Sequence, residues 1–169
     1  MTDATRQSPP QAPELPDEFD LTKASILVVD DHEQNLELLE AYLEDIGCAV
    51  RVARDGVEAL QSVERQPPDL LLLDVMMPRM SGYQLCEKLK AEPHTRGIPV
   101  VMVTALSEIG DVERAVEAGA DDFLTKPVHK VELCTRVKSL LRVRLLRRQL
   151  EGALAEVSRL KDAAGEHND

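Results

Sequence analysis

Five polar side chains stand at the ends of apolar runs in this chain, and together they suit one kind of chemistry. The pairs of run and end residue are "SILVV" with Asp30 and Asp31, "DLLLL" with Asp74, "IPVVMV" with Thr104, and "DDFLT" with Lys126. Carboxylates can bind a divalent cation, while a hydroxyl and an ammonium group can hold phosphoryl oxygens. One of the carboxylates can also act as a nucleophile.

The carboxylates of Asp30, Asp31 and Asp74 would repel each other if the fold brought them together, and a divalent cation would remove that conflict. Only oxygen ligands are on offer, with no histidine or cysteine in register, so the sequence predicts a hard cation, Mg²⁺ or Mn²⁺. One acid at the end of a strand is commonly a loop residue. The whole set at four strand ends is much harder to explain in that way.

The elements that must position these residues alternate between two periodicities. Short apolar runs at 25–29, 49–53, 70–73, 98–105 and 121–126 predict strands, and amphipathic stretches after each of them predict helices. Five such repeats favour a parallel sheet that is covered on both faces. In an open parallel sheet, ligands bind beyond the carboxyl ends of the strands, which is where all five polar residues fall.

Composition limits the classes of protein to consider. The 169 residues carry a formal net charge of −11, which argues against bulk affinity for nucleic acid. The cysteines Cys48, Cys86 and Cys134 form no CxxC pair, so we expect neither a disulfide framework nor a zinc site, and a reducing cytoplasm. Neither a secretory signal nor a membrane span is predicted.

The two ends of the chain differ from its middle. Residues 1–23 are rich in proline and acids, which predicts a flexible tail. Residues 24–142 hold the repeats, residues 143–164 continue the last helix, and residues 165–169 are expected to be a disordered end.

Four segments together resemble the receiver domain of bacterial two-component response regulators: "ILVVDD", "LLLLDVMMPRMSGYQLC", "PVVMVTAL" and "GADDFLTKP". The resemblance covers roughly residues 24 to 142. It implies a flavodoxin-like α/β fold, a doubly wound (βα)5 sheet with strand order 2-1-3-4-5. It also implies a signalling module rather than an enzyme, phosphorylated by a sensor histidine kinase or a phosphotransfer protein.

The resemblance assigns a role to each site residue. Asp74 would be the phosphoacceptor, with Thr104 and Lys126 holding the phosphoryl oxygens. Asp30, Asp31, Asp74 and the backbone carbonyl of Met76 would ligate the cation. Thr104 and Phe123 would form the switch, where family members more often carry tyrosine than phenylalanine. The Lys126–Pro127 peptide bond would be cis.

Two further positions would set the lifetime of the phosphorylated form. In the family, the residues two places beyond the phosphoacceptor and the switch threonine influence hydrolysis of the acyl phosphate. Here these residues are Met76 and Leu106, and their bulk predicts a long-lived phosphorylated form.

The C-terminal stretch has the spacing of a coiled coil. Its seam would consist of Val143, Leu146, Leu150, Ala153, Val157 and Leu160. These residues alternate at spacings of three and four, which predicts a parallel homodimer, although a single helix that folds back on its own domain remains an alternative. In relatives with similar sequences, this helix leads to effectors such as diguanylate cyclases, phosphodiesterases or phosphatases. The given sequence has no room for one, so we expect either a receiver with a helical stalk or a part of a longer protein.

Other functions fit less well. A basic stretch in the same helix lacks aromatic residues and a helix-turn-helix, so nucleic acid is not an expected partner. An aspartate-nucleophile phosphatase of the haloacid dehalogenase type needs an acid where Met76 stands. The remaining alternative is a constitutive dimeric scaffold or adaptor whose output does not depend on phosphorylation.

Overall fold

The computed structural model describes residues 20–105 and 109–165. The strands are β1 (Ser25–Val29), β2 (Ala49–Ala53), β3 (Leu70–Asp74), β4 (Val100–Thr104) and β5 (Asp122–Thr125). The α-helices are α1 (Glu33–Leu43), α2 (Gly56–Arg65), α3 (Gly82–Ala91), α4 (Ile109–Glu117) and α5 (Lys130–Gly165). Short 3-10 turns occur at Leu21–Lys23 and Glu44–Ile46. Strands and helices thus alternate five times.

The five strands form one parallel sheet in the order β2-β1-β3-β4-β5. The central strand β3 is buried along its whole length, as its four consecutive leucines predict. The more polar β2 lies at an edge. Parallel neighbours require crossover connections, which the helices supply. The predicted doubly wound fold and strand order are confirmed.

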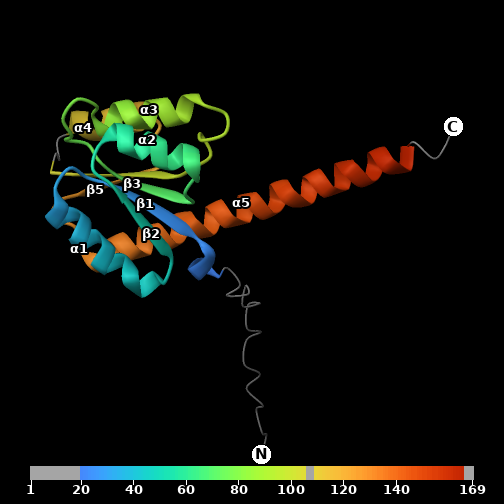
Figure 1. The fold of residues 1–169 in the computed structure, drawn as a ribbon, viewed down its shortest axis with the longest axis horizontal. Coiled ribbons are helices and arrows are strands. Elements are labelled where there is room, and N and C mark those ends of the chain that lie inside the picture. Colours follow the sequence, from blue (N-terminus) through green and yellow to red (C-terminus); the bar gives the residue numbers. More distant parts are fainter. Residues whose placement is uncertain (1–19, 106–108, 166–169) are drawn as a thin grey trace, which may run out of the picture.

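Helices cover both faces of the sheet (Figure 1). The helices α2, α3 and α4 lie over one face, where Val63, Leu89 and Ala115 belong to one buried cluster. The helices α1 and α5 lie over the other face, where Leu39 and Val137 belong to a second cluster. Successive residues of each strand contribute to opposite clusters, and the sheet is fixed from both sides.

Local sequence signals explain where several helices begin and end. The side chain of Asp55 accepts a hydrogen bond from the Glu58 amide and caps α2. Ser81 and Gln84 form a capping box at the start of α3. After the turn at Glu44–Ile46, Gly47 adopts the left-handed conformation, with a φ of 76°, that stops the segment.

The helix α5 continues far beyond the sheet (Figure 1). Its last buried residue is Leu141, and its described part ends at Gly165. The helix extends away from the domain, so the alternative of folding back on it is wrong. No helix within residues 20–105 and 109–165 is both long and apolar enough to cross a membrane.

Three sequence predictions fall wholly or mainly outside the described residues. The expected tail at 1–23 is described only from Asp20, and the expected end at 165–169 only at Gly165. Leu106 also lies outside the described part of the chain.

Candidate functional site

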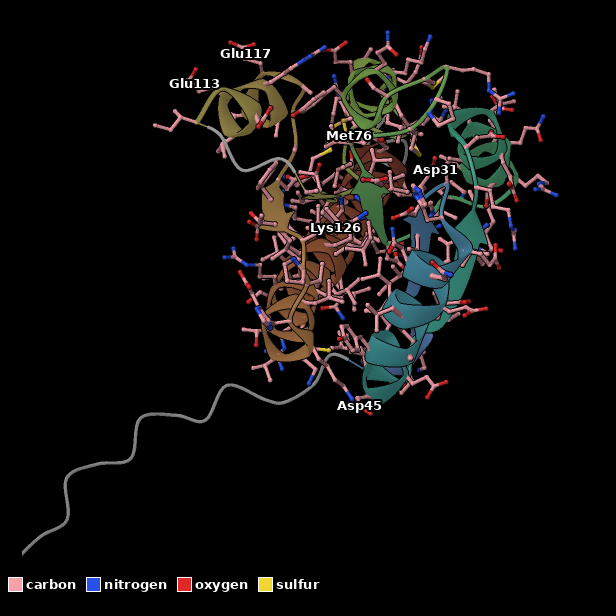
Figure 2. All side chains as sticks on the ribbon, turned by 90° about the vertical axis from the view of Figure 1, so that its left-hand side faces the viewer. Asp31, Asp45, Met76, Glu113, Glu117 and Lys126 are labelled. Carbon is pink, nitrogen blue, oxygen red and sulfur yellow. The ribbon has the colours of Figure 1, made fainter. Side chains whose placement is uncertain are left out.

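The carboxyl ends of β1 and β3 and the residue after β5 bring two acids and one lysine together. The Lys126 Nζ atom lies 3.1 Å from Asp30 Oδ2 and 3.4 Å from Asp74 Oδ1. Figure 2 looks onto this edge of the sheet, with Asp31, Met76 and Lys126 around the end of β3. Residues from three separate parts of the sequence thus meet as predicted.

Asp30 is held rigidly at the bottom of this site. Its side chain is 1% exposed and accepts hydrogen bonds from the His32 amide at 2.9 Å and from Asn35 Nδ2 at 3.0 Å. With Lys126, these donors surround the buried carboxylate. Asn35 is therefore a site residue that sequence reasoning missed. Its position in the first turn of α1 was the available signal.

Asp74 lies in an environment that disfavours its charged form. Only 3% of its side chain is exposed, and burial, followed by the negative charge of Asp30, raises its pKa. Lys126 and the Met76 amide, which lies 3.4 Å from Asp74 Oδ1, act in the opposite direction but do not cancel the increase. The site therefore favours a species that removes negative charge from Asp74.

His32 corrects the expectation that no histidine lies in register. Its Nδ1 atom lies 3.0 Å from Asp31 Oδ1 and 3.5 Å from Asp30 Oδ1. Asp30, Asp31, His32 and Asp74 each offer a ligand atom, and these four atoms lie within 4.8 Å of one another. The sequence signal was the position of His32 directly after the acid pair.

Thr104 and Phe123 lie on neighbouring strands at the α4 side of the sheet. Thr104 ends β4, is fully buried and pairs in register with Thr125. Phe123 lies opposite Met102 and packs partly buried against the cluster under α2, α3 and α4. Because side chains alternate along a strand, Thr104 and Met102 share that face. The two proposed switch residues are thus arranged on one side of the sheet.

The segments after β3 and β5 shape the rim of the site. The Met76 side chain is 59% exposed, and the Lys126–Pro127 peptide bond is cis. The Gly82 amide donates a hydrogen bond to the Val75 carbonyl at 3.0 Å, which brings the start of α3 against the end of β3. A Cβ atom at Gly82 would overlap the Asp74 carbonyl oxygen, so this approach requires glycine.

The donor set fits a hard cation. Three of the four clustered groups are carboxylates, and a buried pair of acids has one neighbouring ammonium group, from Lys126. Carboxylate oxygens are the ligands that Mg²⁺ and Mn²⁺ prefer, whereas an imidazole is more typical of other metals. His32 is better placed to orient Asp31 than to bind Mg²⁺ itself.

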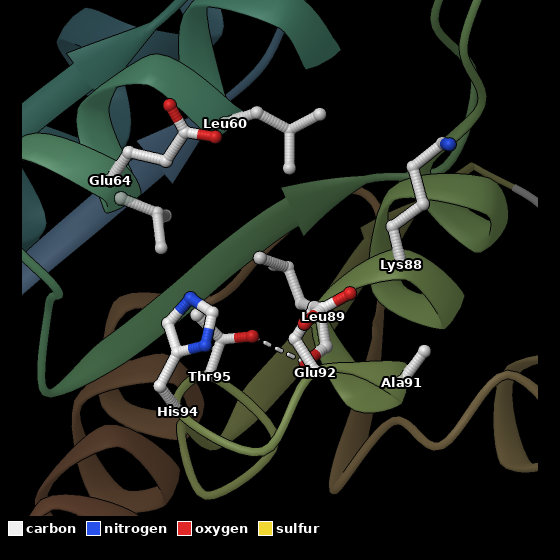
Figure 3. A pocket seen from close by; sticks show the side chains of 9 residues that line it. Leu60, Glu64, Lys88, Leu89, Ala91, Glu92, His94 and Thr95 are labelled. Atoms are coloured by element: carbon white, nitrogen blue, oxygen red, sulfur yellow. Dashed lines mark hydrogen bonds between the residues drawn. The ribbon is translucent and has the colours of Figure 1, made fainter.

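A separate groove of about 480 Å³ lies between the C-terminal ends of α2 and α3 (Figure 3). Glu64, Glu92 and His94 line it, and the Thr95 hydroxyl donates to the Leu89 carbonyl at 2.6 Å. These helix ends lie at the edge of the sheet opposite Asp74. The groove is therefore not part of the acidic site.

The predicted seam residues all lie on the exposed part of α5. Exposure reaches 46% at Val143, 59% at Leu150 and 59% at Leu160. Leu146, Ala153 and Val157 are also exposed. The structure adds Leu154, which is 60% exposed and which the seam prediction omitted because Ala153 fits the spacing of three and four.

Comparison with known sequences identifies the family. The profile described as the response regulator receiver domain matches residues 26–138. The chain is 49% identical over 142 residues to the response regulator PleD of Caulobacter vibrioides, covering 84% of this chain and 31% of PleD. It is 44% identical over 117 residues to the alkaline phosphatase synthesis transcriptional regulatory protein PhoP of Bacillus subtilis, covering 69% and 48%. The chain thus spans about a third of PleD and about half of PhoP.

Solved structures agree with the sequence comparison. The signal receiver domain of a signal transduction histidine kinase from Syntrophus aciditrophicus has a TM-score of 0.67 at 44% identity, covering 70% of this chain and 90% of that chain. The receiver domain of the sensor histidine kinase PA1611 from Pseudomonas aeruginosa, described with magnesium coordinated in its active site cleft, has a TM-score of 0.65 at 33% identity, covering 70% and 98%. Profile, relatives and fold agree, and the chain belongs to the response regulator receiver domain family.

Proposed function

We propose that this receiver domain accepts a phosphoryl group on Asp74 in the presence of Mg²⁺ and thereby switches a surface for partner binding or dimerisation. The observation that carries the proposal is the position of Lys126 Nζ at one sheet edge, 3.1 Å from Asp30 Oδ2 and 3.4 Å from Asp74 Oδ1. A sensor histidine kinase or a phosphotransfer protein would supply the phosphoryl group in the cytoplasm. The domain would be regulatory and would catalyse only reactions of its own acyl phosphate.

Each residue would contribute one part of the reaction. The carboxylate of Asp74 would attack the phosphorus atom of the donor phosphohistidine, forming an acyl phosphate while the P–N bond breaks and the donor imidazole leaves. The burial that raises the pKa of Asp74 also favours this product, because the carboxylate loses its own charge. Lys126 would hold a phosphoryl oxygen, and the Thr104 hydroxyl would donate to another. Asp30, Asp31, Asp74 and the Met76 carbonyl would hold Mg²⁺, which neutralises charge on the phosphoryl oxygens when bound.

The switch would start from the new charge. A phosphoryl group adds about −1.5 to −2 charges and three acceptor oxygens, toward which Thr104 would move. Phe123 stands on the same face of the sheet and would occupy the space that Thr104 leaves. The surface of α4, β5 and α5 would then change shape as a two-state element.

Acetyl phosphate tests the proposed acceptor. With Mg²⁺, intact mass spectrometry should show the addition of one phosphoryl group to the wild-type chain and none to Asp74→Asn. Asp162→Asn removes an exposed acid of α5 instead and should label as the wild type does. Equal labelling of Asp74→Asn would overturn the assignment, and labelling that persists in EDTA would overturn the role of Mg²⁺.

We further propose that the exposed seam of α5 pairs with a second copy in a parallel coiled coil. Beyond Arg148, which still pairs with Asp69, the helix extends away from the domain while its apolar positions continue at spacings of three and four. An isolated helix of this kind gains little stability without a partner. In the same register, Glu156 of one copy lies near Lys161 of the other, which adds a favourable charge pair. The receiver domain would then end near residue 142 and the seam would extend over 143–164.

Light scattering with and without beryllofluoride, a phosphoryl mimic, tests both the dimer and its control. Leu150→Glu should weaken the dimer by at least about a hundredfold, since it places a charge in the seam. Ser158→Glu adds the same charge on the outer face and should have little effect. A monomeric wild type would overturn the seam, and a dimer that ignores beryllofluoride would favour the constitutive scaffold.

A further inference from the structure

A small cavity lies where α5 leaves the sheet, at the edge opposite Asp74. Its volume is about 100 Å³, well above the roughly 10–15 Å³ that one water molecule needs. The residues used in the argument below are Lys90, Arg96, Gly97, Asp121, Arg144 and Arg147. They come from α3, the α3–β4 connection, the residue before β5, and α5. The cavity therefore joins the domain to the base of its helical extension.

The one acid that lines this cavity in the described structure already has partners. Asp121, the single carboxylate among the described residues that line it, lies 2.9 Å from Lys90 Nζ and also accepts a hydrogen bond from the Val100 amide at 2.8 Å. The adjacent Arg148 lies 2.5 Å from Asp69 at the base of β3. Asp121 and Asp69 are thus already paired, with Lys90 and Arg148.

Three guanidinium groups remain without a counterion. Within residues 20–105 and 109–165, Arg96, Arg144 and Arg147 form no ion pair. Lys90 donates instead to Asp121 and to the Ile98 carbonyl at 2.7 Å. A cluster of unpaired cations is unexpected on a chain with a net charge of −11, because acids are abundant elsewhere. The cavity is therefore a local positive site on an acidic protein.

Arg144 lies beside Gly97 at the cavity wall. Its Nη1 atom lies 2.9 Å from the position that a Cβ atom at Gly97 would occupy, so the guanidinium group packs directly against the glycine backbone. Its Nε atom is buried and has no hydrogen-bond partner in the described structure. A buried N–H group without an acceptor is costly, so a residue of the cavity wall carries a donor whose hydrogen-bonding capacity is unused.

We propose that this cavity binds a phosphate group of a small molecule. Guanidinium groups match the oxygens of phosphate with paired, charge-assisted hydrogen bonds, and three of them approach the cavity from two different elements. The volume accommodates a phosphate group but not a nucleoside, so the remainder of an ester would project through the mouth. The bound group would connect Arg96 of the α3–β4 connection to Arg144 and Arg147 of α5.

An NMR titration of the ¹⁵N-labelled full chain with inorganic phosphate tests the site. The ionic strength is kept constant with sodium chloride, and EDTA keeps the Asp74 site free of metal. The Gly97 amide should shift and saturate. Arg144→Gln and Arg147→Gln should each weaken binding by about tenfold, the effect of losing one charge-assisted contact. Arg144→Lys should bind between the wild type and Arg144→Gln.

Arg142→Gln is the matched control, because it removes one charge from an exposed position of α5 that does not line the cavity. Its affinity should stay within about twofold of the wild type. Equal weakening in Arg142→Gln, a shift that does not saturate, or no shift at Gly97 would overturn the proposal. Arg147 is exposed, so its variant tests the site even if Arg144→Gln fails to fold.

A second arm compares inorganic phosphate with adenosine monophosphate. Tighter binding of the nucleotide would assign the source as a phosphate ester, and equal affinity would assign it as free phosphate. The same titration on Asp74→Asn should be unchanged, so failure at this cavity is distinguishable from failure of the phosphoacceptor proposal.

Discussion

At the scale of the residue, Asp74 shows how a fold can keep a reactive carboxylate in an environment that disfavours its charge. It is nearly fully buried beside Asp30, and Lys126 is shared between the two acids. A buried carboxylate that must share its only nearby cation with a second carboxylate destabilises the folded chain. This cost is removed when the charge of Asp74 is neutralised. Reactivity and instability therefore have the same structural origin.

Removal of the Asp74 charge should stabilise the metal-free protein. In EDTA at pH 7, we expect Asp74→Asn to melt a few degrees above the wild type, since 1 kcal/mol corresponds to about 2–4 °C in a chain of this size. Lys126 keeps its partner Asp30 in the variant. Differential scanning fluorimetry measures the change, with Asp162→Asn as the control. A lower melting temperature for Asp74→Asn would contradict this account of the site.

Cys86 should be the least reactive of the three cysteines. It is fully buried, and burial raises the pKa of its thiol to about 11, so about one molecule in a thousand carries the thiolate at pH 8. Cys48 and Cys134 are half-buried. We expect iodoacetamide to label Cys86 at least about tenfold more slowly than either, as peptide mass spectrometry would show. In urea the three rates should converge, and fast labelling of native Cys86 would refute the prediction.

The sequence predicted those site residues whose positions follow from topology. Asp30, Asp74 and Lys126 each end or follow a strand, so parallel pairing alone brings them to one edge. Asn35, His32 and the unpaired arginines were not predicted, because they lie on helices or connections. The rotation of a helix and the path of a loop depend on packing that no local pattern states.

At the scale of the element, the connection between β3 and α3 holds the site together. Gly82 begins α3 within contact of the backbone that carries Asp74, and the capping box of Ser81 and Gln84 fixes the first turn. The spacing of apolar residues predicted this helix, but not the closeness of its start to β3. That closeness is possible because Gly82 has no Cβ atom, and only the three-dimensional structure shows which backbone atoms it approaches.

Gly82→Ala should therefore be strongly destabilising. The new Cβ would overlap backbone atoms of Asp74 and Val75, which cannot rotate away, and we expect a loss of about 2–4 kcal/mol in the free energy of unfolding. Gly152→Ala is the matched control, since it meets no atom within 4 Å and should gain up to about 1 kcal/mol of helix propensity. Urea denaturation measures both. Equal effects of the two substitutions would exclude a specific clash at Gly82.

At the scale of the whole molecule, one continuous helix, α5, belongs to both the receiver domain and its C-terminal extension. Leu141 is the last buried residue of α5, yet Arg144 packs on Gly97 and Arg148 reaches Asp69 at the base of β3. The apolar pattern predicted a boundary near residue 142. It did not indicate that contacts between charged side chains and the domain continue for more than one further turn.

Arg148→Gln should loosen this junction without unfolding the domain. The Arg148 side chain is 56% exposed, so the lost ion pair should lower the free energy of unfolding by less than about 1 kcal/mol. Asp69 would still accept from the Ser25 amide at 2.9 Å. Hydrogen exchange at residues 142–150 should accelerate, while Arg159→Gln, farther along α5, should leave it unchanged. Unchanged exchange in Arg148→Gln would show that the ion pair does not hold the helix.

The uninterrupted course of α5 makes the molecule a lever. Beyond Leu141, 24 residues of helix reach about 36 Å from the domain at 1.5 Å per residue. A rigid rod of that length moves its tip by roughly 0.6 Å for each degree of tilt at its base. Small displacements of the domain surface under α5 therefore produce larger displacements at the far end of the helix. Bending at Gly152 would reduce the displacement of the tip.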